Sequence, residues 1–298
     1  MKKGPIYVAL CYVLWGILPV FWKLFGEVSS LYILACRVVF SLIFCFVVVV
    51  LEGKLDTLRL VLHDKKQCLL LCACGIMITI NWGSFILSVS IGHVMESSLA
   101  YYMNPIMAIV LGFFVFHERL KPIQWVAVGL AFIGILIPLI SYGKIPWLAL
   151  VIGITMAVYS AMKKYVKADS EISIFMETLF VSPFALVYII YAERTGIGAS
   201  DLLHGWQWLL LPAAGIVTSV PLAMLSFGIK TTPLSLSGIM MYINPTLQLL
   251  VSVLLFHEKF TIINGITFAF VWVALILFVY GNTKTLRAKE TASHTAVE

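Results

Sequence analysis

The chain has 298 residues, of which 61% are hydrophobic and 11% are charged, with a formal net charge of +6 at pH 7. An ordinary soluble domain has roughly 45–50% apolar and about 25% charged residues, so a soluble fold could not cover this much apolar surface. The composition therefore predicts an all-α integral membrane protein in contact with the lipid bilayer. The basic residues lie between apolar runs, as juxtamembrane anchors do, and no basic tract supports a nucleic-acid partner.

Apolar stretches in chain order predict the membrane-crossing helices, because about 20 residues of helix cross a hydrocarbon core of roughly 30 Å. We predict ten spans: 6–25, 31–51, 68–90, 95–116, 123–142, 146–162, 172–191, 206–228, 235–256 and 262–280. No connection between them exceeds about 16 residues, which leaves no room for a soluble domain.

The distribution of basic residues predicts the orientation, because cytoplasmic loops carry an excess of Lys and Arg. With the N-terminus inside, 15 basic residues lie on the inner side. Four lie outside, and one lies within a span. The outer four are Lys23, Lys144, Arg194 and Lys259. Both termini are therefore expected in the cytoplasm, as an even number of spans requires.

A long motif occurs twice, 140 residues apart. Residues 102–119 read "YMNPIMAIVLGFFVFHER" and residues 242–259 read "YINPTLQLLVSVLLFHEK". Each copy belongs to a set of five spans, and an odd number places the second set in the membrane with inverted topology. Inverted repeats that meet at the midplane are typical of secondary transporters. The alternative is a duplication that persists only as a stable helix bundle.

The repeated Asn-Pro pairs lie inside apolar helices, where each proline frees the carbonyl four residues earlier. Such breaks are tolerated where they face protein or a water-filled cavity. The asparagines either line that cavity or form hydrogen bonds between packed helices. The candidate cavity residues from this motif are Tyr102, Asn104, Pro105, Tyr242, Asn244 and Pro245. For the repeated His-Glu we expect a helix cap or an ion pair near the membrane surface, because neighbours on a helix do not share a face.

Two ionisable residues lie inside predicted spans, where a buried charge is expensive and marks a functional hypothesis. Arg37 lies about six residues inside the second span, and Glu177 follows 140 positions later, in the seventh. Arg37 either serves the transport pathway or extends outward along its stem to the membrane surface. Glu177 either handles substrate or protons, which would make it the coupling group, or makes a structural hydrogen bond.

Further polar and aromatic residues occur at similar depths in other spans. "TINWGSF" places Asn81 and Trp82 midway along the third span, and its counterpart "TSVPLAM" contains Ser219. Trp15 in the first span is a further candidate. These residues line the cavity or pack helices. No catalytic set, metal-ligand cluster or cofactor motif occurs, so we expect neither an enzyme nor a metal site.

Several segments together resemble one protein family. They are "VMESSLAYYMNP", "FHERL" followed by "QWVAVGLAFIGI", "AAGIVTSVPLAM" and "TFAFVWVALILFVYG". In this order and spacing they resemble the RarD-type members of the EamA branch of the drug/metabolite transporter superfamily. The resemblance implies two inverted five-helix EamA repeats, at 1–142 and 146–282, and a cytoplasmic polar tail at 283–298. It also implies export of small molecules across a bacterial cytoplasmic membrane.

The family's functional residues map onto this chain at three places: Glu96, the Asn104-Pro105 pair and Glu177. The second half departs from the first, because Leu236 occupies the position 140 residues after Glu96. The role of Glu96 is therefore expected to be asymmetric.

Energy coupling is predicted to be secondary, because no nucleotide-binding GxxxxGK[ST] motif occurs and no ATPase subunit is required. The sequence thus predicts a secondary transporter of small metabolites or drugs that works by alternating access, with protons as the expected coupling ion. The alternatives are a membrane receptor or scaffold without transport, and an uptake carrier for amino-acid-like metabolites.

Overall fold

The computed structural model describes residues 3–90, 94–142, 147–255, 257 and 262–295, and every regular element among them is helical. Each predicted span coincides with described helix, because each is an apolar run bounded by polar, glycine or proline residues. The corresponding elements are α1 (Gly4–Trp22) with the 3₁₀ turn η1 (Lys23–Phe25), α2 (Ser30–Leu51), α4 (Lys65–Ser90), α5 (Val94–Phe116), α6 (Pro122–Tyr142), α7 (Trp147–Lys163), α8 (Ser170–Arg194), η2 (Gly205–Leu209) with α9 (Leu210–Ile229), α10 (Leu234–Met240) with α11 (Ile243–Leu255), and α12 (Ile262–Thr295).

Six helical stretches of the described chain are long and apolar enough to cross a membrane. They are Gly4–Phe25, Ser30–Leu51, Lys65–Phe85, Ser170–Arg194, Gly205–Ile229 and Leu234–Leu255. Four further apolar segments are shorter: Met103–Phe116, Pro122–Ile137, Trp147–Lys163 and Gly265–Gly281. Large apolar side chains such as Phe184, which is 76% exposed, cover the outer surface, as lipid contact requires.

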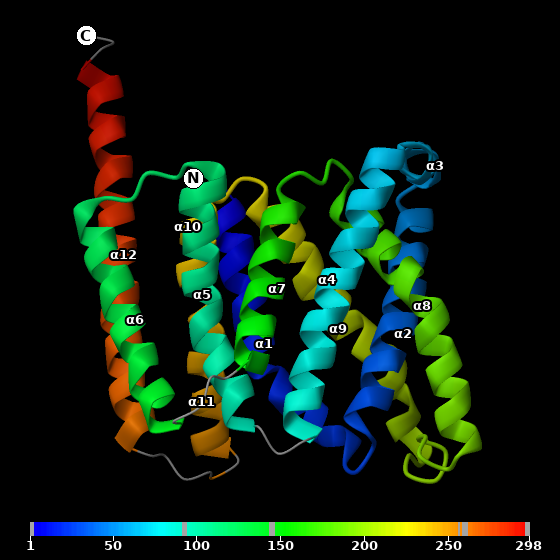
Figure 1. Cartoon of the computed structure of the whole chain (residues 1–298). Helices are drawn as coiled ribbons and strands as arrows, with labels where there is room; N and C mark the ends of the chain where they lie inside the picture. The colour runs from blue at the N-terminus through cyan, green and yellow to red at the C-terminus, as the bar shows by residue number, and fades with distance from the viewer. Residues whose placement is uncertain (1–2, 91–93, 143–146, 256, 258–261, 296–298) are drawn as a thin grey trace.

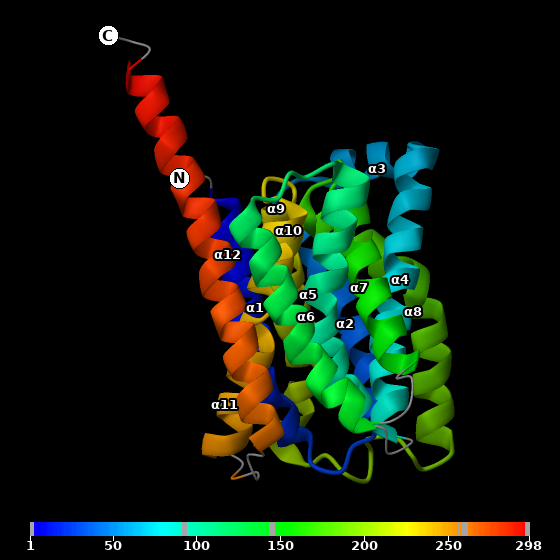
Figure 2. The ribbon, with the colours of Figure 1, turned by 60° about the vertical axis from the view of Figure 1, so that its left-hand side comes forward.

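The helices form a bundle with two faces, which the directions of the helices define (Figure 1). We call the end at which α1 begins and α12 ends the terminal face, and the other end the opposite face. The helix α1 runs from the terminal face to the opposite face, whereas α7 runs back to the terminal face (Figure 1). Between them, α2 packs against α8 and α9, and α5 packs against α7 and α10. The pair α6 and α12 forms one edge of the bundle (Figure 2).

The two Asn-Pro motifs differ in backbone structure. The first lies within the continuous helix α5, which contains Pro105. The second lies at an interruption, because α10 ends at Met240 and α11 begins at Ile243. There the carbonyl of Met241, which the ring of Pro245 excludes from an ordinary helical bond, accepts the N–H of Asn244 at 3.1 Å. The second motif is thus a local break and the first is not.

Both copies of the His-Glu motif end a helix in the same way. His117 and His257 have φ angles of 50° and 54°, and they are the non-glycine residues of the described chain in the left-handed region. The N–H of Glu118 then donates to the carbonyl of Gly112 at 3.1 Å. This six-residue closure is typical of a helix C-terminus that ends in a left-handed residue.

Two features of the backbone lie outside the predicted spans. The helix α3 (Leu55–His63) occupies the connection between α2 and α4, with one buried residue, Leu58, on its inner side. The helix α12 continues to Thr295, well beyond the predicted end of the last span at 280. The segment predicted as a polar tail is therefore helical where the structure describes it (Figure 1).

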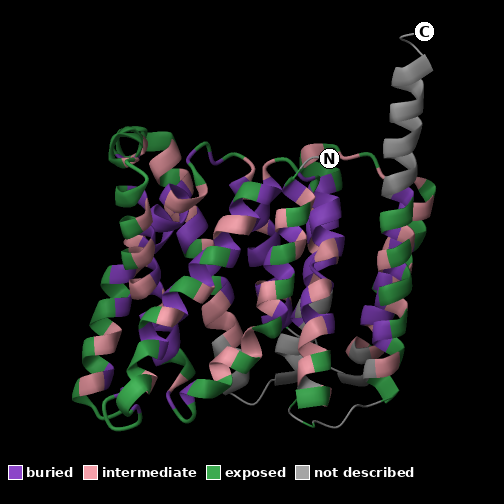
Figure 3. Ribbon diagram, turned by 180° about the vertical axis from the view of Figure 1, so that it is seen from behind, coloured by how far each residue is buried: buried purple, intermediate pink, exposed green. Residues whose placement is uncertain are grey.

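Buried residues gather in the half of the bundle next to the terminal face (Figure 3). The largest cluster includes fully buried Tyr12, Leu71, Tyr159, Met176 and Leu225. Close helix contact makes this packing possible: a Cβ on Gly75 of α4 would lie 2.6 Å from the carbonyl oxygen of Glu177 on α8. The terminal half is therefore a dense core.

Candidate functional site

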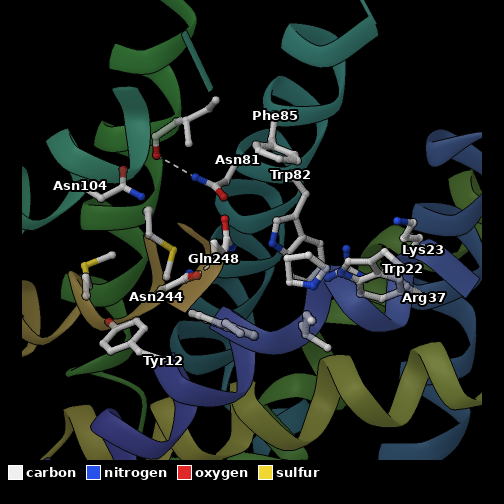
Figure 4. A pocket seen from close by; sticks show the side chains of 16 residues that line it. Tyr12, Trp22, Lys23, Arg37, Asn81, Trp82, Phe85, Asn104, Asn244 and Gln248 are labelled. Atoms are coloured by element: carbon white, nitrogen blue, oxygen red, sulfur yellow. Dashed lines mark hydrogen bonds between the residues drawn. The ribbon is translucent and has the colours of Figure 1, made fainter. Parts of the chain in front are cut away.

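A cavity of about 390 Å³ lies between the helices, beyond the dense terminal half (Figure 4). Its lining extends from Tyr12 and Met156, midway along their helices, to Trp22 and Lys23 at the opposite face. The helices α1, α2, α4, α5, α7 and α11 all contribute to the wall. The volume falls within the range of small-molecule sites, roughly 300–1,000 Å³.

Side-chain amides form the inner end of the cavity. Asn81 donates from Nδ2 to the carbonyl of Ile152 at 2.7 Å, which fixes its orientation (Figure 4). Asn244 accepts from Gln248 Nε2 at 2.8 Å. The Oδ1 of Asn104 is buried and has no hydrogen-bond partner in the described structure. An orphaned buried acceptor is costly, so this atom is suited to receive a donor from a ligand.

Both repeated asparagines therefore lie on the cavity wall, as do Asn81, Trp82 and Trp15. Space for Asn104 comes from the facing helix, because a Cβ on Gly153 of α7 would lie 3.3 Å from its Oδ1. The cavity wall also includes residues that the sequence analysis did not single out: Tyr12, Trp22, Lys23, Phe85 and Gln248. The clustering of aromatic residues at one end of α1 was the available signal for Trp22.

Arg37 lies on the cavity wall and does not extend to the membrane surface. Its guanidinium carbon lies 4.7 Å from the ring centroid of Trp22 and 4.6 Å from that of Trp82. Its Nε donates to Thr218 Oγ1 at 2.9 Å, and that hydroxyl in turn donates to the carbonyl of Ala214. The guanidinium is thus held between two indole rings and oriented by α9 (Figure 4).

Glu177 lies away from the cavity, in the dense terminal half. Lys163 Nζ is 2.6 Å from its Oε1, and the two side chains are 0% and 3% exposed. Ser173 Oγ donates to the same oxygen at 2.8 Å, and Tyr159 donates to Oε2 at 3.0 Å. Sequence reasoning placed Lys163 in the cytoplasmic loop, whereas it is the last, fully buried residue of α7.

Some predicted cavity residues have other locations. Tyr242 is fully buried in a packing cluster with Ile109 and Phe278, so it is not on the cavity wall. The prediction failed for Tyr242 because the break before α11 turns this residue toward α6 and α12. Pro105, Pro245 and Ser219 are also buried, and they do not line the cavity. The side chains of Tyr102 and Glu96 lie outside the described part of α5.

Polar contacts close the terminal face between α5 and α10. The carboxylate of Glu118 accepts the N–H of Leu234 at 2.5 Å and that of Ser235 at 2.8 Å, which caps α10. The expected cap is therefore confirmed for Glu118, but it caps a different helix. Lys164 Nζ lies 4.0 Å from the same carboxylate and donates to the Thr232 carbonyl at 2.7 Å. Burial lowers the pKa of Lys164, and the charge of Glu118 opposes this effect.

Similar proteins agree with this architecture. A model of the EamA-like transporter family matches residues 2–140. An uncharacterized transporter of Bacillus subtilis is 36% identical over 293 residues, 97% of this chain and 98% of its own length. Protein RarD of Escherichia coli is 34% identical over 291 residues, 96% of this chain and 97% of its own. The chain belongs to the EamA family.

Within the EamA family the chain is a RarD-type member. A protein of Pseudomonas aeruginosa named chloramphenicol-sensitive protein RarD is 30% identical over 291 residues, 96% of each chain. A solved crystal structure with 17% identity has a TM-score of 0.73 and covers 92% of this chain and 96% of its own, which shows the shared fold. The chain is therefore a multi-pass membrane transporter of a family found in bacteria.

Proposed function

We propose that this EamA protein is a secondary transporter in which the substrate occupies the cavity and reaches either side of the membrane by alternating access. The observation that carries this proposal is the cavity itself, because both repeated asparagines line it and its wall reaches only the opposite face. A site that is open to one side and closed to the other is what alternating access requires.

Two inverted repeats, 1–142 and 146–282, would supply the two conformations. The opposite directions of α1 and α7 support this division (Figure 1). The helix contacts also occur in exchanged pairs: α1 packs on α9 as α7 packs on α4, and α2 packs on α9 as α8 packs on α4. With ten spans, the four shorter apolar segments cross the membrane together with the six longer ones.

The excess of basic residues near the terminal face places both termini in the cytoplasm. The cavity then faces the outside, and the dense half closes the cytoplasmic side. The location is the bacterial cytoplasmic membrane, and the direction we propose is export. In the conformation that loads substrate from the cytoplasm, the contacts of Glu118 with Leu234 and Ser235 separate, because they join the two proposed repeats.

Coupling to protons is proposed at Glu177. Its carboxylate is held by Lys163 here, so it is neutralised without a proton while the terminal half is closed. A proton would bind when the pair separates during opening toward the cytoplasm. Replacing both partners, Lys163→Met with Glu177→Met, should keep a neutral core and remove the pH dependence of transport. An unchanged pH profile would exclude this pair from coupling.

The function is tested by comparing the metabolites outside bacteria that express the wild type with those outside bacteria that express Asn104→Ala/Asn244→Ala at the same membrane level. We expect one chemical class to accumulate outside only with the wild type. Depletion of a class from the medium would instead identify an uptake carrier. Identical profiles from two folded, inserted proteins would contradict transport through this cavity and favour a receptor or scaffold.

A further inference from the structure

The charged residues of the cavity are both positive. Lys23 and Arg37 line its end at the opposite face, and none of the described lining residues is acidic. A cavity whose charges have one sign attracts ligands of the other sign and disfavours its own. The wall therefore selects against an organic cation, for which it offers no carboxylate among the described residues.

The surroundings of Arg37 restrict how an anion can approach it. The rings of Trp22 and Trp82 cover its two faces, at 4.7 Å and 4.6 Å, and Thr218 accepts from Nε. A ligand can therefore meet the guanidinium only at its edge. There the N–H groups lie in one plane, the geometry that matches the two oxygens of a carboxylate.

The other end of the cavity requires a hydrogen-bond donor. Asn104 is 6% exposed, and its Oδ1 has no partner among the described residues. Its neighbour Asn81 is already fixed by the Ile152 carbonyl, so it cannot turn its amide nitrogen toward Asn104 without losing that bond. A hydroxyl, amine or amide N–H on the ligand would satisfy this acceptor.

Apolar and aromatic side chains line the space between these two ends. Trp15, Phe85, Ile152 and Met156 all lie on the wall. Such a surface binds an apolar or aromatic body and gives no partner to a highly hydrated one. A phosphate ester would carry up to two charges and bind a large shell of water, so it suits this wall less than a carboxylate of single charge.

We propose that the substrate is a small organic carboxylate with an apolar or aromatic body, held by Arg37 at the carboxylate and by Asn104 through a hydrogen-bond donor. This inference rests on the proposed transport function and specifies its substrate class. Arg37 is the residue that distinguishes carboxylates from neutral compounds of the same shape. Charge-assisted hydrogen bonds make this distinction worth roughly 10- to 100-fold in affinity.

The first experiment measures the metabolites outside cells that express the wild type, Arg37→Gln, Arg37→Lys or the control Arg194→Gln. Arg194 is a matched control because it is exposed at the opposite face and outside the cavity. We expect the wild type and Arg194→Gln to release the same carboxylates. Arg37→Gln should release at least tenfold less, and Arg37→Lys should be intermediate because it keeps the charge but not the planar fork.

The outcomes separate the substrate class from the function. Release of only amines, neutral compounds or phosphate esters by the wild type would overturn the carboxylate proposal and leave transport intact. Release of carboxylates that is unchanged in Arg37→Gln would overturn the role of Arg37. No change in any metabolite with the wild type, in either direction, would overturn the transport function itself and this inference with it.

A binding experiment on the purified protein in lipid nanodiscs guards against a folding defect in the variant. The probes are 3-phenylpropionate and its neutral amide, compared by the shift in thermal unfolding temperature. The wild type should be stabilised more by the acid than by the amide, and in Arg37→Gln this difference should disappear while the unfolding transition remains cooperative. Equal shifts from acid and amide in the wild type, including no shift from either, would contradict the proposal.

Discussion

Arg37 and Glu177 occupy corresponding positions, 140 residues apart, but their surroundings are opposite. Arg37 lies on the cavity wall near the opposite face, between two indole rings. Glu177 lies in the dense half near the terminal face, in contact with Lys163. The correspondence extends to the lysines, because Lys23 of the cavity precedes Lys163 by the same 140 residues.

The difference between the two sites is one reversal of charge. In the second half an acid faces a base, and the pair can be buried because its charges cancel. In the first half both residues are basic and both line the cavity. Two cations are unsuited to a sealed core, but they suit a hydrated cavity that receives an anion. Similar positions thus close one end of the protein and form a binding surface at the other.

The largest effect should come from making the second site resemble the first. Glu177→Arg would bury two cations side by side, and loss of a single partner from a buried pair already costs about 3–5 kcal/mol. That loss is comparable to the whole stability of many proteins, roughly 5–15 kcal/mol. We expect no folded protein after detergent extraction, as measured by size-exclusion chromatography. The neutral pair Lys163→Met/Glu177→Met should stay folded, and a monodisperse Glu177→Arg variant would refute the importance of the ion pair.

The reverse change, Arg37→Glu, should abolish transport and leave the fold intact. The cavity can hydrate the new carboxylate, so the unfolding temperature should change little. A negative charge beside the ring faces repels a substrate carboxylate, and release should fall more than 100-fold, beyond the effect of Arg37→Gln. The measurement is the amount of released carboxylate per folded protein. Equal activity in Arg37→Glu and the wild type would show that the substrate does not meet this residue.

A smaller effect is expected at the contact that closes the terminal face. Glu118→Gln removes the charge that caps α10 and attracts Lys164, a change worth about 1 kcal/mol. That energy would shift the balance between the two conformations by a factor of about five. A cysteine placed at the cavity residue Leu18 should then react more slowly with an impermeant reagent from outside. An unchanged rate would mean that this cap does not bias the conformations.

The smallest effect concerns the repeated histidines. His117 and His257 both adopt positive φ, which is less favourable for histidine than for glycine. His117→Gly should therefore raise stability by about 0.5–1 kcal/mol, and His257→Gly should do the same. Thermal unfolding of each variant measures the effect. A stabilisation of one site and a destabilisation of the other would mean that the two helix ends are not equivalent.

The helices were predictable from sequence because each is a long apolar run, and the cavity asparagines were predictable because amides beside prolines stand out in such runs. Lys163 was not, because a lysine at the end of an apolar stretch ordinarily faces the membrane surface. Its burial depends on Glu177, which lies 14 residues further along and returns to it across a short turn. Trp22 and Tyr242 were misjudged for a related reason: the sequence gives the depth of an aromatic residue but not the side of the helix that meets a cavity.

The most direct test of the account compares the two ends of the protein by cysteine labelling. The native cysteines other than Cys74 are replaced, and Leu18→Cys is added in one variant. Leu18 lines the cavity, whereas Cys74 is fully buried in the dense half. We predict that an impermeant maleimide added to intact cells labels Leu18→Cys, and that Cys74 reacts only after unfolding. Labelling of Cys74 from outside, or of Leu18→Cys only in inside-out vesicles, would contradict a cavity that opens away from the termini.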